Sequence, residues 1–216
     1  MKKFDQELAT LKQRLAEMGA LAESMVTAAS DALINADRAA IERVRTSEPR
    51  LDRFQVEIDR EAIRLITVYS PVAKDLRVLL MMARINSELE RIGDHALDNC
   101  QYVEILPSDP SQRPARELSD MSAMTSRMVH DALQAFEHED IDKAQTVIGL
   151  EEEVDVMNAE TFRQLLEHTG TTPQLITRGI GLILAAQSLK RIADHATNIC
   201  EEVFYLVEGE DIRHRT

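Results

Sequence analysis

Apolar residues recur at helical spacing along most of the chain. Steps of three and four residues place side chains on one face of a helix, and this spacing is clear in the row Leu79, Met82, Ile85, Leu89 and Ile92. It returns in residues 176–192, where Ala, Leu, Gln and Arg fill the positions between. No stretch shows the sustained alternation of a strand. The pattern therefore predicts an all-α protein with these apolar rows in its core.

Helix-breaking and helix-capping residues divide the chain into six expected helices. In the first half we expect helices at about 5–35, 39–68 and 71–106, and in the second at about 115–137, 141–167 and 173–207. The expected caps and breaks are Asp37, Pro71, Asp140, Gly170, Pro173 and Gly209. Helices of roughly thirty residues are about 45 Å long. Each set of three should therefore form an elongated, antiparallel bundle.

The chain is internally duplicated. Residues 89–103 recur as 189–203 at a constant offset of one hundred positions, and the residues with identical twins are Leu89, Arg91, Ile92, Asp94, His95, Ala96, Cys100 and Val103. Between the halves, residues 107–114 contain three prolines, which cannot continue a helix. We therefore predict two tandem, sequence-related three-helix bundles at 1–106 and 115–209. The linker is 107–114, and a C-terminal tail covers 210–216.

Charge and hydropathy narrow the classes of function. The formal net charge of -13 argues against nucleic acid or an anionic membrane as a partner, because both need basic patches. No apolar run reaches the roughly 18 to 20 residues that cross a bilayer, and no signal region follows Met1. We expect a cytoplasmic protein without direct membrane insertion. Cys100 and Cys200 are then expected to be reduced, buried thiols.

Two acidic pairs in the first half are spaced to face each other across a helical hairpin. Glu48 and Asp52 share one helix face, as do Glu90 and Asp94, and the midpoints of 48 with 94 and of 52 with 90 both fall at position 71. The predicted turn lies there. Asp98 adds a fifth carboxylate one turn along.

Carboxylates gathered at one level repel one another unless a cation neutralises them. The pattern therefore indicates a metal site. Oxygen ligands fit Mg²⁺, Mn²⁺, Ca²⁺ or oxidised iron better than a structural zinc site, although the sequence does not identify the ion and Zn²⁺ stays among the candidates.

The second half repeats this geometry with one change of charge. Glu151 and Asp155 are expected to face Lys190 and Asp194, because both midpoints fall at 172.5, beside Pro173. Lys190 occupies the position of Glu90, and Asn198 that of Asp98. A lysine there could bridge Asp155 and Asp194 without a metal. We therefore expect weaker cation binding in this half, or none.

Four duplicated residues flank these acids. His95 and His195 follow Asp94 and Asp194 directly, so their side chains point about 100° away along the helix. We interpret both histidines either as residues that support the metal ligands without binding the metal or as residues at an interface. Arg91 and Arg191 are expected to pair with nearby acids.

Other interpretations stay open. A single Glu-x-x-x-Asp on a long helix is usually a solvated face. A di-iron oxidase needs Glu-x-x-His pairs in register on facing helices, which the acidic helices do not offer. A histidine–aspartate phosphohydrolase needs His before Asp, whereas the order here is Asp94-His95. A metal-free helical scaffold with another partner is the stronger competitor, and a carboxylate-metal enzyme is the weaker one.

The sequence resembles the PhoU family over nearly the whole chain. The motifs that carry the resemblance are Arg-Ile-Gly-Asp at 91–94 and Arg-Ile-Ala-Asp at 191–194, Pro-x-x-x-Asp-Leu-Arg at 71–77, Asn-Ile-Cys-Glu at 198–201, the ending 204–209 and the tail residues 211–214. Each is weak alone, but their order and spacing are specific.

The resemblance implies a pair of three-helix bundles whose Glu/Asp-x-x-x-Asp motifs hold multinuclear metal clusters in some members. Carried over, the ligands are Glu48, Asp52, Glu90 and Asp94 in one half and Glu151, Asp155 and Asp194 in the other. Lys190 departs from the acidic residue usual at its position.

The resemblance further implies a non-enzymatic negative regulator of phosphate uptake and of the phosphate-starvation response. Its partners would be the ATPase subunit of a phosphate ABC transporter and a sensor histidine kinase, and a homodimer is expected.

Overall fold

The computed structural model describes residues 2–35, 37–106, 116–168 and 172–209. These residues form seven helices and no strand, which are α1 (Lys2–Asn35), α2 (Arg38–Tyr69), α3 (Ala73–Glu104), α4 (Arg116–His138), α5 (Ile141–Gly149), α6 (Glu151–His168) and α7 (Pro173–Glu208). The all-α class is confirmed. The predicted linker 107–114, the tail 210–216 and Gly170 lie outside the described residues.

Several helix ends form where the sequence predicts them. The Asp37 carboxylate accepts a hydrogen bond from the Ala39 N–H at 2.9 Å, and the Asp140 carboxylate accepts one from Lys143 N–H at 3.0 Å. Such caps satisfy amide donors that the first helical turn leaves free. Gly209 ends α7 at a φ of 75°, in the left-handed region that favours glycine. Pro71, however, precedes α3, which begins two residues later at Ala73.

The second helix of the second half is interrupted, so the prediction of one helix at 141–167 was wrong. α5 and α6 meet at Leu150, whose N–H donates to the Val147 carbonyl at 3.0 Å, a tighter step than the α-helical one. Gly149 lies directly before this break. Glycine costs a helix about 1 kcal/mol relative to alanine, which weakens the helix at this point.

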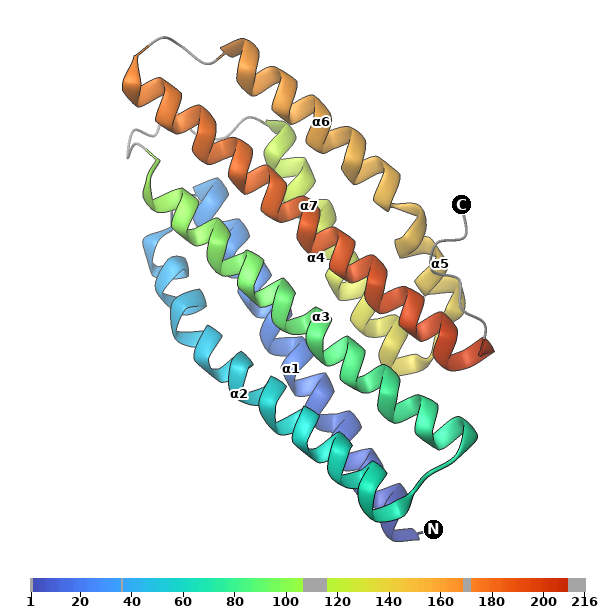
Figure 1. The fold of residues 1–216 in the computed structure, drawn as a ribbon. Coiled ribbons are helices and arrows are strands. Elements are labelled where there is room, and N and C mark those ends of the chain that lie inside the picture. The colour runs from blue at the N-terminus through green and yellow to red at the C-terminus, as the bar shows by residue number, and fades with distance from the viewer. Residues whose placement is uncertain (1, 36, 107–115, 169–171, 210–216) are drawn as a thin grey trace.

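The seven helices form two antiparallel bundles that lie side by side (Figure 1). α1, α2 and α3 pack together in one half, and α4 to α7 in the other. The halves meet through α3 against α7 and through α1 against α4, so that these four helices form the centre of an elongated molecule. α2 and the α5–α6 pair flank this centre on opposite sides.

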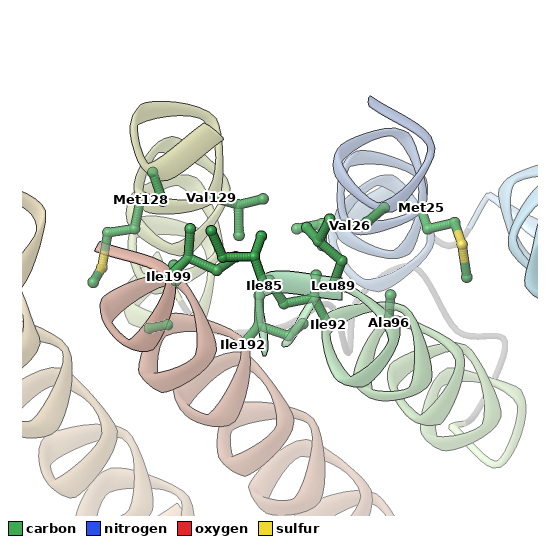
Figure 2. Close-up of a cluster of buried hydrophobic side chains, with 14 of the residues drawn as sticks. Met25, Val26, Ile85, Leu89, Ile92, Ala96, Met128, Val129, Ile192 and Ile199 are labelled. Atoms are coloured by element: carbon green, nitrogen blue, oxygen red, sulfur yellow. The ribbon is translucent and has the colours of Figure 1, made fainter. Parts of the chain in front are cut away.

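One hydrophobic core runs through both halves. Its buried residues include Leu89 and Ile92 from α3 and Ile192 and Ile199 from α7 (Figure 2). Figure 2 shows Val26 of α1 and Val129 of α4 pointing toward each other, whereas their neighbours Met25 and Met128 point away toward their own halves. The halves are therefore packed as one body.

Two further expectations concern burial and hydropathy. Cys100 and Cys200 are both free and buried, which confirms the expectation of unpaired thiols. Among the described helices, none is long and apolar enough to cross a membrane.

Candidate metal centre

The first-half acids come from α2 and α3, at a level where these two helices approach closely. Gly93 precedes Asp94, and a Cβ atom added at Gly93 would collide with the side chain of Leu51, which precedes Asp52. The missing side chain therefore lets the backbones of α2 and α3 come together beside the two carboxylates. This local packing brings acids of two helices within electrostatic reach.

The charges of these acids are incompletely compensated. Burial raises the pKa of Glu48, and the negative charges of Asp52 and Asp94 raise it further. The pKa of Asp94 is raised by burial and then by Asp52 and Asp98. For Glu90, burial and Asp94 raise the pKa, and Arg91 offsets only part of this effect. The carboxylates of α2 and α3 therefore oppose one another's ionisation.

The chemistry of these side chains fits a hard cation, but their positions do not form a complete coordination shell. All of its donors are carboxylate oxygens, the ligands that Mg²⁺, Mn²⁺ and Ca²⁺ prefer. A cation would also relieve the repulsion that, after burial, raises the pKa values of Glu48, Glu90 and Asp94. Among the described residues, however, no three His, Cys, Asp or Glu side chains already stand as a metal site. Binding therefore needs side-chain rearrangement, for which Asp52 and Asp94 are exposed.

The second-half acids surround an internal cation. The Lys190 Nζ lies 2.9 Å from Asp155 Oδ1 on α6 and 2.9 Å from Asp194 Oδ1 on α7. Burial lowers the pKa of Lys190, but hydrogen bonds to both aspartates outweigh this and leave it raised. Burial and Asp194 raise the pKa of Glu151, while Lys190 opposes the shift. These residues do not fit a metal ion, because an ammonium already stands between the two aspartates.

The duplicated histidines lie at the contact between the halves. The rings of His95 and His195 stack with centroids 5.4 Å apart and an interplanar angle of 18°. His95 Nδ1 lies 3.4 Å from Asp98 Oδ2. Burial lowers the pKa of His95, and His195 lowers it further. Arg91 and Arg191 are exposed on α3 and α7.

Three polar contacts between α3 and α7 were not predicted. Glu88 Oε2 on α3 lies 2.7 Å from His195 Nδ1 and accepts a hydrogen bond from the Asn198 amide at 3.0 Å. Arg84 contacts the buried carboxylate of Glu202 at 3.2 Å. Asn198, proposed from the sequence beside the second metal site, thus contacts the other half. The twin of Glu88 is Ser188, so the repeat holds no signal for this contact.

The chain is similar to known proteins over nearly its full length. The PhoU domain family matches twice, at residues 15–103 and 118–203. The phosphate-specific transport system accessory protein PhoU homolog of Pseudomonas aeruginosa is 34% identical over 98% of this chain and 88% of its own length. The accessory protein PhoU of Escherichia coli is 32% identical over the same shares.

Solved structures agree with these sequence relatives. The crystal structure of PhoU from Pseudomonas aeruginosa matches with a TM-score of 0.91 at 34% identity, over 96% of this chain and all of that one. The phosphate transport system regulatory protein PhoU from Streptococcus pneumoniae matches with a TM-score of 0.88 at 27% identity, over 97% and 99% of the two chains. Sequence, duplication and fold agree, and the chain belongs to the PhoU family.

Proposed function

We propose that this protein regulates phosphate uptake and the phosphate-starvation response as a cytoplasmic adaptor. It would contact the ATPase subunit of a phosphate transporter and a sensor histidine kinase, and act as a negative regulator without catalysis. The observation that carries the proposal is the match over nearly the whole chain to relatives named as phosphate-specific transport accessory proteins. Long packed helices supply extended faces for partner helices, which suits an adaptor.

We further propose that the first-half acids bind a hard cation that this role requires. The support is the opposed ionisation of Glu48, Glu90 and Asp94 across α2 and α3. An acidic protein binds phosphate poorly by direct contact, whereas a carboxylate-held cation can bridge to a phosphate or to an acidic group of a partner. The ligands would be Glu48, Asp52, Glu90 and Asp94, with Asp98 close by.

The test combines metal content with regulation in cells. Glu90→Ala with Asp94→Ala should lose most of the Mn²⁺ that the purified wild-type protein retains after dialysis, because two of four ligands are gone. Cells carrying this variant should express phosphate-starvation genes at high phosphate. The matched control is Glu137→Ala with Glu153→Ala, which removes two exposed carboxylates elsewhere and should behave as wild type.

Two results would contradict the proposal. Unchanged metal content and unchanged repression in the Glu90/Asp94 variant would remove both the metal and its role. Lost repression with unchanged metal content would assign these acids to direct partner contact.

A pull-down of the transporter ATPase and the sensor kinase at high and low phosphate tests the adaptor role itself. Absence of both partners would favour a paralogue with another partner.

A further inference from the structure

We propose that the second half carries its own permanent cation, the Lys190 ammonium, and takes up no metal, so that only the first half of the molecule is metal-responsive. This inference rests on the proposed metal binding of the first half. It assigns different tasks to two sites that the duplication placed at equivalent positions. The first-half hairpin would respond to metal, and the second-half hairpin would stay fixed.

The position of the ammonium carries the argument. Lys190 stands where the first half has Glu90, and its Nζ reaches aspartates on two different helices at 2.9 Å. It lies 3.1 Å from the second carboxylate oxygen of Asp194 as well. The Lys190 side chain is only 23% exposed, so the amine is held within the site and does not extend freely into solvent. It therefore occupies the place between α6 and α7 that a bridging metal would need.

The numbers of charged groups at the two sites also favour metal binding in the first half only. The first half gathers the five carboxylates Glu48, Asp52, Glu90, Asp94 and Asp98, whereas the second keeps Glu151, Asp155 and Asp194 beside one ammonium, and Asn198 is neutral. A divalent ion entering the second site would meet fewer ligands and the repulsion of a positive charge a few ångströms away. The ion pairs already supply the link between α6 and α7. A metal would have to displace them to bind.

A reciprocal exchange of the two equivalent residues tests this assignment. Lys190→Glu should bind more Mn²⁺ per chain than wild type, as measured by calorimetric titration, because it restores the acidic pattern of the first half. Glu90→Lys should bind less, because it transfers the internal ammonium to α3. The double variant combines Glu90→Lys with Lys190→Glu. Adding Asp155→Asn to it should abolish Mn²⁺ binding, and adding Asp52→Asn should not. Circular dichroism checks that each variant folds.

Thermal unfolding in chelator and in Mn²⁺ gives a readout independent of stoichiometry. The single variant Asp155→Asn should keep the Mn²⁺-induced rise in melting temperature that wild type shows. The single variant Asp52→Asn should lose it. If Lys190→Glu does not fold, Lys190→Met replaces it, since this variant removes the ammonium without adding charge. Its melting temperature should fall in chelator and recover in Mn²⁺.

The outcomes separate this inference from the proposed function. Loss of wild-type Mn²⁺ on Asp155→Asn would overturn the inference, as would a folded Lys190→Glu or Lys190→Met that gains no Mn²⁺ response. Wild type without any Mn²⁺ response, together with a Lys190→Glu that acquires one, would support the Lys190 assignment. That same result would refute metal binding in the first half.

Discussion

The two cysteines are residues whose environment makes a direct prediction. Burial raises the pKa of Cys100 and of Cys200 to about 12, and only the thiolate is reactive. We predict that neither thiol reacts with a thiol-specific reagent in the folded protein at mildly alkaline pH, and that both react in denaturing urea. Absorbance of the released chromophore measures this. A fast reaction in native buffer would show that a thiol is accessible.

At the same scale, sequence alone could place some site residues but not others. Glu48 and Asp94 could be brought together because a hairpin pairs positions that mirror each other about its turn, and Lys190 could be paired with Asp155 in the same way. Glu88 could not be found. Its partners His195 and Asn198 lie 107 and 110 positions away along the chain. Their contact depends on how α3 pairs with α7, and the repeat pattern does not reveal this pairing.

At the scale of elements, capping chemistry located helix ends better than residue propensity located breaks. Asp37 and Asp140 each satisfy a helix-start amide, so their sequence signal has a direct structural cause. Pro49 lies inside α2, although proline typically costs a helix interior about 3 kcal/mol or more. The milder residue Gly149 precedes a break. The intrinsic cost of a residue therefore does not decide by itself whether a helix continues, because tertiary packing supplies most of the stability of a helix in a protein.

The pairing of α3 with α7 gives a prediction about Glu88. Burial raises the pKa of Glu88, but hydrogen bonds with His195 and Asn198 outweigh it, so that the pKa lies below its ordinary value. A carboxylate with a lowered pKa contributes stability above its unfolded-state pKa and loses it as the pH falls through the folded-state value. Glu88→Ala should therefore lower the free energy of unfolding at neutral pH by about 1 to 3 kcal/mol.

Urea denaturation at a series of pH values measures the effect of Glu88→Ala. The difference from wild type should shrink as the pH falls below the ordinary pKa of a glutamate and through the lowered pKa of Glu88, because the wild-type carboxylate then becomes protonated. Glu88→Gln is the control, because it keeps one acceptor oxygen and should lose less stability. Equal stability of Glu88→Ala and wild type at neutral pH would show that the contact does not hold the halves together.

At the scale of the whole molecule, the duplication was visible in the sequence, whereas the union of the halves was not. Apolar rows assign residues to a core but do not say which helices share it. In the structure, a Cβ atom added at Gly19 of α1 would lie 2.6 Å from Leu133 Cδ2 of α4, so these helices approach closely across the junction. One core then serves two repeats. Each half alone would expose the apolar surface that it buries against the other.

A shared core predicts that the two halves unfold together. Leu89 is fully buried and lies in the cluster between the halves (Figure 2). Leu89→Ala should lower the free energy of unfolding by about 2 to 5 kcal/mol, as expected for a buried leucine that leaves a cavity. Because α3 packs on both α1 and α7, scanning calorimetry should show a single transition that moves as a whole to lower temperature. Two transitions, of which Leu89→Ala shifts only one, would mean that the repeats fold as independent units despite their common core.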